Sequence, residues 1–297
     1  MDDPGVAHGF TSVDSQPRPG DWVRVLDRVA AEPFYAAYKQ RLQELLRPAA
    51  GGVFLEVGAG TGDAAQALCS RWGAEVVAVD SSLTMVAQAR ARGLAHACVA
   101  DGHRLPFGAG RFDGAWADRV VQHVADPGRV LDEVLWVVRP GGRVALADPD
   151  YDTQVLDIDD QDLARRVLRF RADVLLRNGT LAHRHGGLLA ERGLDDITVE
   201  ARTLVVRDPS AVDHVMGLRT WAHTAAVRGH LDPADADRFV VQFDEAARTG
   251  CFTYAVTFFL TAGTLPDAPN RPTSAVRTYG RASGSPSTYA RSSSARE

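Results

Sequence analysis

Short apolar runs alternate with stretches of helical periodicity through the first half of the chain. The runs predict buried strands at residues 53–57, 76–79, 97–100, 112–117 and 144–147. Apolar residues at helical spacing predict helices at 64–72, 81–92 and 127–138, after two N-terminal helices around 22–29 and 42–46. Strands that alternate with helices in this way indicate an α/β fold with a doubly wound, mostly parallel sheet.

After Asp148 the regular alternation of strands and helices ends. Helical patterns cover about 160–192, 209–227 and 233–248, and apolar runs predict two further strands at 197–206 and 251–261. The helical segment 209–248 is thus an insertion between the last two strands. We expect it to lie over the ligand-binding edge of the sheet or beside it.

The two ends of the chain differ from the middle in composition. Residues 1–20 carry acids, prolines and glycines without the apolar core of a signal peptide, so we expect a flexible N-terminus. Residues 269–297 are rich in Ser, Arg, Pro, Thr and Gly and cannot bury enough surface to offset their ordering entropy, which predicts a disordered tail. One domain is therefore expected at 21–268, with 209–248 as a helical cap insertion.

The bulk composition excludes several classes of protein. The 297 residues are 45% hydrophobic with a net charge of −5, which suits one large globular domain or two small ones. We find neither the basic stripe of a nucleic-acid binder nor an apolar window long enough for a transmembrane helix. Cys69, Cys98 and Cys251 lack paired spacing, which predicts buried, reduced thiols in the cytoplasm rather than a disulfide or metal framework.

A glycine-rich turn, Glu56–Asp63 with the sequence EVGAGTGD, includes the end of the first predicted strand. Such a turn lets a ligand approach the backbone closely, and the next helix offers free N–H groups at its start. A dinucleotide fingerprint has glycine at its first, third and sixth positions, whereas the sixth position here is Asp63. An acid there would repel a pyrophosphate and suit the ammonium and sulfonium groups of S-adenosylmethionine (SAM).

Two more acids stand at the ends of predicted strands. Asp80 ends the second strand, where a carboxylate can accept hydrogen bonds from both hydroxyls of a ribose. Asp101 follows the third strand, where it could meet an adenine amino group. Each acid alone could be an ordinary helix cap. Because ligands of open α/β sheets gather at the carboxyl ends of strands, the acids and the glycine turn together favour a nucleotide-like ligand.

These residues resemble the motifs of class I SAM-dependent methyltransferases, and the resemblance covers about residues 20–265. Glu56–Gly62 is similar to the first motif of the family, and Asp80 to its ribose acid. Residues 100–113 are similar to the segment around its third and fourth strands, and the RPGG turn at 139–142 to the turn before its fifth. Among its groups, the chain most resembles the ubiquinone/menaquinone-biosynthesis-like one, which includes many natural-product methyltransferases.

The resemblance implies a fold and a cofactor. The sheet would have the strand order 3-2-1-4-5-7-6 with strand seven antiparallel, and S-adenosyl-L-methionine would be the cofactor. The residues that the resemblance implies for cofactor binding are Glu56, Gly58, Gly60, Gly62, Asp80, Ser81, Met85, Asp101, Gly102 and Asp118.

The methyl acceptor is expected to be a small apolar or aromatic molecule, such as a secondary metabolite or a quinone precursor. Methyl transfer is an in-line displacement that gains from alignment and, where the acceptor loses a proton, from a general base. His123, just past the fourth strand, is the candidate base, and the alternative is a packed histidine that shapes the loop. Candidate acceptor contacts are Tyr151, Trp221 and His223. The apolar side chains of the insertion would cover the acceptor or else complete the core: Val215, Met216, Leu218, Trp221, Phe239 and Phe243.

Two other functions share part of this pattern. A protein of the methyltransferase fold that binds SAM without transferring a methyl group, as a cyclase-like relative or a binding module, would carry the same motifs. A NAD(P)-dependent oxidoreductase is disfavoured by Asp63. His183 and His185 have no carboxylate at ligand spacing, so no metal is expected. Phe34 and Tyr35 are weak pocket candidates in the N-terminal helices.

Overall fold

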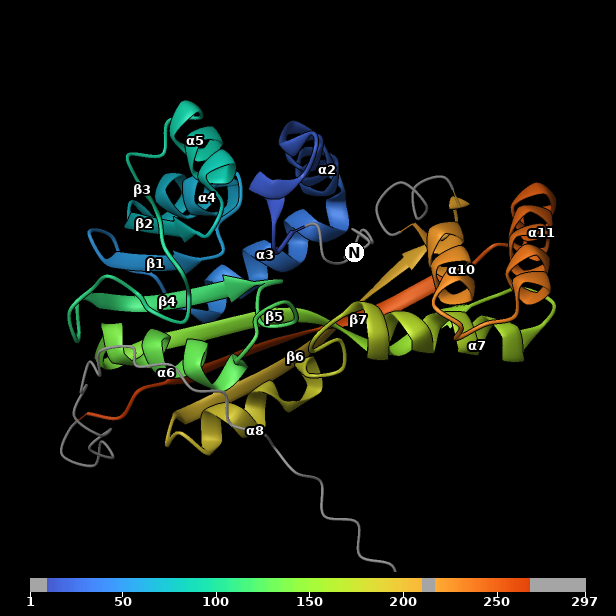
Figure 1. Cartoon of the computed structure of the whole chain (residues 1–297). Coiled ribbons are helices and arrows are strands. Elements are labelled where there is room, and N and C mark those ends of the chain that lie inside the picture. The colour runs from blue at the N-terminus through green and yellow to red at the C-terminus, as the bar shows by residue number, and fades with distance from the viewer. Residues whose placement is uncertain (1–9, 210–216, 268–297) are drawn as a thin grey trace, which may run out of the picture.

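The computed structural model describes residues 10–209 and 217–267, which form one sheet covered by helices (Figure 1). The strand order is β3-β2-β1-β4-β5-β7-β6, with β7 antiparallel to β5 and β6, so the expected order is confirmed. The remaining neighbouring pairs are parallel. The strands are β1 (Val53–Val57), β2 (Glu75–Asp80), β3 (His96–Val99), β4 (Phe112–Asp118), β5 (Val138–Leu156), β6 (Asp195–Val206) and β7 (Tyr254–Thr264).

Helices cover both faces of this sheet. In Figure 1, α3, α4 and α5 lie above it and α6 and α8 below it. The helices are η1 (Val13–Ser15), α2 (Pro19–Ala31), α3 (Pro33–Leu45), α4 (Asp63–Trp72), α5 (Leu83–Ala91), α6 (Pro127–Val137), α7 (Gln161–Phe170), η2 (Arg171–Leu175), η3 (Ala182–Arg184), α8 (His185–Ala190), α10 (Leu218–Val227) and α11 (Pro233–Thr249). Among the described residues, no helix has the length and apolarity needed to cross a membrane.

The central strands are buried on both faces. On β1, Phe54 packs with residues of α3 and α4, whereas its neighbour Leu55 packs on the opposite face with residues of α6. The sequence of such a strand is a continuous apolar run, because the side chains on both of its faces are buried in an apolar environment. This is why the central strands could be predicted from the sequence.

The fifth strand is much longer than the predicted run at 144–147. β5 pairs with β7 from Arg143 opposite Thr264 to Leu156 opposite Tyr254, with a shift of register after Asp150. Both strands therefore continue beyond the parallel part of the sheet. The pattern missed this extension because polar residues interrupt it, although the side chain of Asp150 is fully buried.

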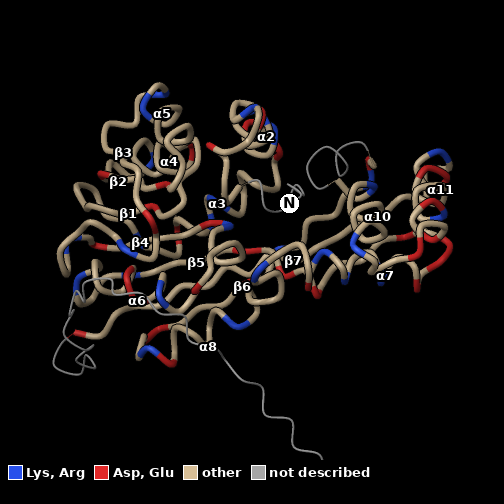
Figure 2. The backbone as a smooth tube through the Cα atoms, viewed as in Figure 1, with Lys and Arg blue, Asp and Glu red and all other residues tan. Residues whose placement is uncertain are grey.

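The helical pattern of the second half resolves into shorter elements. The predicted segment 160–192 divides into α7, the π-helical turn η2, the short helix η3 and α8. Helices α10 and α11 pack on each other and on α7, beside the extended ends of β5 and β7 (Figure 1). Acidic and basic residues are interspersed along α11 (Figure 2) and form ion pairs such as Arg238–Asp235 at 2.7 Å. Residues 210–216 of the insertion lie outside the described residues.

The described part of the N-terminal segment is packed, contrary to the expectation of flexibility over 1–20. Val13 in η1 is buried against Met85 of α5. The carboxylate of Asp14 accepts hydrogen bonds from the Ser82 hydroxyl at 2.8 Å and from the backbone N–H of Leu83 at 2.7 Å. One apolar side chain and one helix-capping acid thus hold a segment whose composition alone suggested disorder. Residues 1–9 and the predicted tail at 269–297 lie outside the described residues.

The cysteines are less buried than predicted. Cys251 is exposed, and Cys69 and Cys98 are half-buried. Cys251 follows Gly250, the C-cap of α11, where the chain turns at the surface before β7 begins. The apolar stretch that suggested its burial starts only at the next residue, Phe252, which is fully buried.

Candidate functional site

A cavity of about 410 Å³ opens at the carboxyl ends of the parallel strands. Its walls come from the turns after β1, β2 and β4, from the N-terminal helices α2 and α3, and from η2 and β7. This is the edge at which open α/β sheets bind ligands, and the volume lies in the range of small-molecule sites.

The glycine turn brings its backbone into the wall of the cavity. Gly58 has a φ of +70°, and a Cβ atom there would lie 2.3 Å from Cγ2 of Val120. Its N–H donates to the carbonyl of Val79 at 2.8 Å, which fixes the turn against β2. A side chain at this position would collide with the loop after β4, so only glycine leaves the turn open to a ligand.

Gly62 has a different role from the one the resemblance implied. It does not line the cavity; it is the N-cap of α4, with a φ of +80°. A Cβ atom here would lie 3.0 Å from Ala89 and 3.1 Å from Leu94. The third glycine therefore permits close packing of α4 against α5, and its contact with a cofactor is not supported by this geometry.

Asp80 joins the glycine turn to the next helix. Its carboxylate accepts hydrogen bonds from the N–H of Gly60 at 2.8 Å and from the N–H of Ser82 at 2.9 Å. The side chain lines the cavity, and burial raises its pKa. Because each carboxylate oxygen has two lone pairs, acceptor capacity remains for a ligand hydroxyl.

Asp101 belongs to a small network at the same edge. Its Oδ1 accepts from the N–H of His103 at 2.9 Å and lies 2.6 Å from Nδ1 of that imidazole. Nε2 of His103 in turn accepts from the N–H of Asp126 at 3.2 Å, so Nδ1 is the nitrogen that donates. Burial raises the pKa of Asp101, but the hydrogen bonds from His103 outweigh it and the net shift is downward. His103 also lines the cavity, which the sequence did not indicate.

Asp63 is not the free acid that the sequence suggested. Its carboxylate lies 3.1 Å from Nη1 of Arg92 and accepts from the Thr61 hydroxyl at 2.8 Å. Arg92, which also pairs with Asp27 at 2.7 Å, compensates part of the charge of Asp63 and so weakens the electrostatic argument against a pyrophosphate. The argument from glycine spacing is unaffected.

Two further acids, Glu56 and Asp118, line the cavity with different hydrogen-bond partners. Oε1 of Glu56 accepts from the indole N–H of Trp116 at 3.1 Å, while the buried Oε2 has no hydrogen-bond partner. Burial raises the pKa of Glu56 to about 8, so the acid is mostly protonated at neutral pH. Asp118 accepts from the Tyr38 hydroxyl at 2.9 Å and lies 3.4 Å from Nζ of Lys39.

His123 also lines the cavity, next to the N-terminal segment. Its ring centroid lies 6.3 Å from that of Phe10, which in turn makes an edge contact with Trp22 at 4.7 Å. Phe10 is therefore part of the wall beside the candidate base. No sequence pattern indicated this contact, because Phe10 lies in a segment expected to be flexible.

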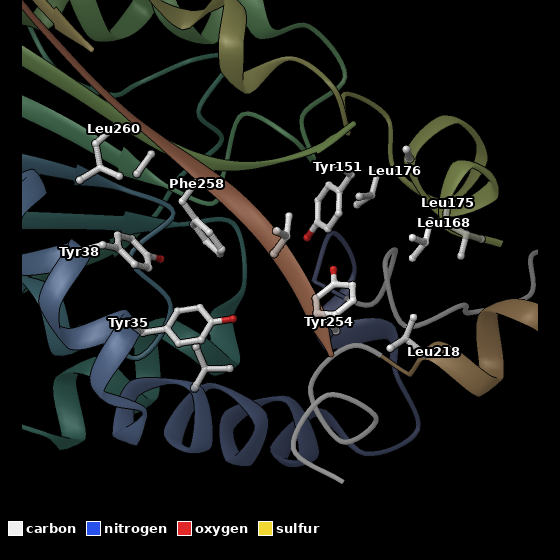
Figure 3. Close-up of a cluster of buried hydrophobic side chains, with 14 of the residues drawn as sticks. Tyr35, Tyr38, Tyr151, Leu168, Leu175, Leu176, Leu218, Tyr254, Phe258 and Leu260 are labelled. Carbon is white, nitrogen blue, oxygen red and sulfur yellow. The ribbon is translucent and has the colours of Figure 1, made fainter. Parts of the chain in front are cut away.

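The remaining wall, which we call the aromatic side, consists of Tyr35, Tyr151 and Phe258. Figure 3 shows the three rings around β7, with the hydroxyls of Tyr35 and Tyr151 directed toward the space between them. Burial raises the pKa of Tyr35 to about 12, so this phenol stays protonated. Two guanidinium groups, those of Arg119 and Arg171, line the cavity here as well. Neither arginine was indicated by the sequence motifs.

Comparison with known proteins agrees with this geometry. Residues 55–146 match the family described as "Methyltransferase domain". An uncharacterised 37.1 kDa protein in transposon Tn4556 of Streptomyces fradiae is 34% identical over 246 residues, which cover 81% of this chain and 70% of that protein. The chain belongs to the class I SAM-dependent methyltransferases. Its cofactor is S-adenosyl-L-methionine.

A named relative of this methyltransferase matches over a shorter region, and a solved structure matches in its fold. O-methyltransferase CnsE of Penicillium expansum is 36% identical over 110 residues, which cover 35% of this chain and 40% of that enzyme. Phosphoethanolamine N-methyltransferase 2 of Haemonchus contortus, solved in complex with SAM, superposes with a TM-score of 0.56 at 17% identity. That superposition covers 87% of this chain and 60% of the other, and it shows the shared fold.

The cavity of this methyltransferase collects nine of the ten residues expected to bind the cofactor, and Gly62 is the exception. The lining residues among them are Glu56, Gly58, Gly60, Asp80, Ser81, Met85, Asp101, Gly102 and Asp118. The open glycine turn, the unpartnered Oε2 of Glu56 and the spare acceptor capacity of Asp80 fit a ligand that carries an amino acid and a ribose.

The three candidate acceptor contacts have different positions. Tyr151 lines the cavity, but Trp221 and His223 do not. Trp221 is 1% exposed and packs in the core, and His223 is on the exposed face of α10. Because α10 lies beside the sheet, its apolar face contacts α7 and α11 rather than a ligand.

The other apolar residues of the insertion also complete the core. Leu218, Phe239 and Phe243 are fully buried, and no described residue of the insertion lines the cavity. Val215 and Met216 lie outside the described residues. Of the two roles considered for this segment, its described part therefore completes the core and does not line the cavity.

The two histidines considered for a metal site each face one aspartate. Nδ1 of His183 lies 2.6 Å from Asp150, and Nε2 of the buried His185 lies 3.7 Å from Asp148. Within the described ranges, no three His, Cys, Asp or Glu side chains are grouped as metal ligands would be. Burial lowers the pKa of His185 to about 4, so this imidazole is neutral at physiological pH.

Proposed function

We propose that this methyltransferase transfers the methyl group of SAM to a small acceptor with an aromatic or apolar body, giving S-adenosylhomocysteine. One observation carries the proposal: a single cavity is bordered by the glycine turn and by the aromatic side. The first wall suits the cofactor, and the second suits a flat ligand that packs against rings.

The cofactor would lie along the strand ends. Gly58 and Gly60 would contact its methionine part, between Glu56 and Asp118. Asp80 would bind the ribose hydroxyls with the acceptor capacity that its two backbone hydrogen bonds leave free. Residues Ser81, Met85, Asp101 and Gly102 would border the adenine.

The bound cofactor would supply an electrophilic methyl group on a sulfonium. The protein's own contribution would be alignment and exclusion of water, and ideal alignment can lower such a barrier by about 7–11 kcal/mol. Tyr35, Tyr151 and Phe258 would hold the acceptor ring on the aromatic side. His123 would accept the proton of an acceptor hydroxyl as the methyl group arrives.

A turnover assay with labelled SAM tests the proposal. Phenols, catechols and hydroquinones, each with and without a carboxylate, would be offered to the full chain, and S-adenosylhomocysteine formation would be measured. We expect turnover with at least one aromatic compound and micromolar binding of S-adenosylhomocysteine. Tight S-adenosylhomocysteine binding without turnover across the panel would favour a SAM-binding protein that transfers no methyl group. Binding of NADH without SAM would overturn the assignment altogether.

A further inference from the structure

The guanidinium of Arg171 is buried at the cavity with hydrogen-bond donors to spare. Arg171 is the first residue of the π-helical turn η2 and is only 7% exposed. Its Nη2 donates to the hydroxyl of Tyr151 at 3.1 Å, but its buried Nε and Nη1 have no hydrogen-bond partner. π-Helical turns are rare and occur frequently at functional sites. The side chain therefore offers unsatisfied donors at the wall of the cavity.

Two aromatic rings hold this guanidinium in place. Its Cζ lies 3.9 Å from the ring centroid of Trp221 and 4.6 Å from that of Tyr151. Cation–π contacts stabilise the positive charge, but a ring face accepts no strong hydrogen bond. Among residues 10–209 and 217–267, no carboxylate lies within 4 Å of the Arg171 guanidinium to form an ion pair. The rings orient the group and leave its charge uncompensated.

A second arginine repeats this arrangement nearby. Arg119 follows β4 with a φ of +56°, and its buried Nε has no hydrogen-bond partner. Its Cζ lies 5.3 Å from the ring centroid of Tyr35. The positive charges of Arg119 and Arg171 both lower the pKa of the Tyr35 hydroxyl. The two guanidinium groups are therefore close enough to act on the same side chain.

The nearby acids offset these charges only in part: Asp118 and Asp148 act on Arg119, but among the described residues no carboxylate forms an ion pair with Arg171. Asp118 already accepts from Tyr38 and lies next to Lys39. The sulfonium and ammonium groups of the cofactor would add positive charge that its single carboxylate only partly offsets. An isolated buried charge is costly, and unpartnered buried donors cost more still, so a site of this kind is stabilised by an anion.

We propose that the methyl acceptor carries an oxyanion, a carboxylate or a phosphate, that binds Arg171 on the aromatic side of the cavity, with Arg119 close by. Guanidinium groups are the preferred partners of both oxyanions. In this arrangement Trp221 orients Arg171 and does not touch the acceptor. The inference rests on the proposed methyl transfer, and it narrows the acceptor to aromatic or apolar acids.

Calorimetry on the protein saturated with S-adenosylhomocysteine tests the anion site. The probes are 4-hydroxybenzoate, its neutral analogue 4-hydroxybenzamide, and phenyl phosphate. We expect at least one anion to bind about ten- to one-hundredfold more tightly than the amide, the range for charge-assisted hydrogen bonds. Equal affinities for acid and amide, or no binding of either anion at millimolar concentration, would overturn the proposal.

Variants assign the preference to Arg171. Arg171→Gln should abolish the difference between acid and amide, and Arg171→Lys should retain part of it because the charge remains. Arg165→Gln, at an exposed arginine of α7 paired with Asp162, should behave like the wild type. Thermal unfolding of each variant checks its fold, and Tyr151→Phe gives a second test if Arg171→Gln does not fold. An unchanged anion preference in a folded Arg171→Gln variant would contradict the proposal.

A second titration separates the acceptor from the cofactor's own carboxylate. S-adenosylhomocysteine and 5′-methylthioadenosine, which lacks the amino-acid part, would be bound to wild type and to Arg171→Gln without any acceptor. We expect each of the two ligands to bind Arg171→Gln with about the same affinity as it binds the wild type. If Arg171→Gln weakens only S-adenosylhomocysteine, Arg171 binds the cofactor, and the acceptor proposal is wrong. Selective anion binding without turnover would leave the anion site standing and overturn only the proposed methyl transfer.

Discussion

The hydroxyl of Tyr38 in α3 donates a hydrogen bond to Oδ1 of Asp118 at the end of β4, across 2.9 Å. Tyr38 is 1% exposed, and burial raises the pKa of its phenol well above the usual value, so the group stays a donor. The bond ties an N-terminal helix to an acid in the wall of the cavity. The helices before β1 are therefore part of the site as well as of the core.

Replacing Tyr38 with phenylalanine tests this connection. Tyr38→Phe should lower the free energy of unfolding by about 1–3 kcal/mol, because a mostly buried carboxylate loses a hydrogen bond. Binding of S-adenosylhomocysteine should weaken as well, since Asp118 is less fixed. Urea denaturation and calorimetry measure the two effects. Thr203→Val, at an exposed threonine pair between β6 and β7, should change stability by no more than about 0.5 kcal/mol. Equal stability of Tyr38→Phe and wild type would contradict the connection.

Asp80 should matter for binding more than for folding. Asp80→Ala removes the acceptor for the Gly60 and Ser82 N–H groups and the proposed ribose contact. We expect the affinity for S-adenosylhomocysteine to fall by about 1–3 kcal/mol, while the circular dichroism spectrum stays that of the wild type. An unchanged dissociation constant would exclude the ribose assignment.

The cofactor half of the site could be predicted from the sequence because its signals are local. Buried parallel strands give continuous apolar runs, and the glycines and acids follow those runs directly at Gly58, Asp80 and Asp101. Strand ends meet at one edge in a parallel sheet, so positions along the chain translate into positions in space. Gly62 shows the limit of this reasoning, since its neighbours Ala89 and Leu94 come from α5 and from the turn after that helix.

The aromatic side could not be predicted in the same way. The wall and its two arginines come from segments scattered over the whole chain. The long pairing of β5 with β7 brings Tyr151 near Phe258, whereas Tyr35, Arg119 and Arg171 reach the cavity from α3, from the loop after β4 and from η2. A weak signal did exist. Arg171 follows buried residues at helical spacing, Val167 and Leu168, which places it on the inner face of its helix. Arginine is rarely fully buried, so the pattern alone did not reveal a functional residue.

Trp221 and His223 form a matched pair on α10, because the sequence proposed both as acceptor contacts. Trp221→Ala should cost about 3–5 kcal/mol of stability, as for other large buried aromatics, and it should also release Arg171. His223→Ala should leave both stability and turnover unchanged, because the side chain is exposed and away from the cavity. Thermal unfolding and the labelled-SAM assay test the pair, and a loss of activity in stable His223→Ala would restore the sequence-based assignment.

Glu56 should make stability depend on pH. Its pKa is raised from 4.5 to about 8 by burial, so the folded state holds a proton that the unfolded state releases above pH 4.5. Its contribution to stability is therefore full below about pH 4.5, declines between about pH 4.5 and 8, and is absent above that range. Glu56→Gln, which cannot titrate, should remove a slope of up to about 1.4 kcal/mol per pH unit from this window. Urea denaturation at several pH values compares the proteins, and parallel curves would show that Glu56 is ionised in the folded state.

His123 is the residue whose chemical role depends most on the acceptor. If the acceptor loses a proton from a hydroxyl, His123→Asn should lower kcat by about 10²–10⁴-fold, the usual contribution of a general base. The dissociation constant of S-adenosylhomocysteine should change little, because the cofactor contacts proposed above do not include this imidazole. The labelled-SAM assay gives kcat, and calorimetry gives the affinity.

Chemical rescue separates a proton acceptor from a packing residue at His123. Added imidazole should restore part of the activity of His123→Asn if the lost group took a proton, whereas it would not repair a misplaced loop. His96→Asn, at an exposed histidine of β3, is the control for an imidazole that does not line the cavity. A change in kcat of less than about threefold, below the range of general-base effects, or a large loss without rescue, would mean that His123 shapes the wall beside Phe10 and that alignment alone supports the transfer.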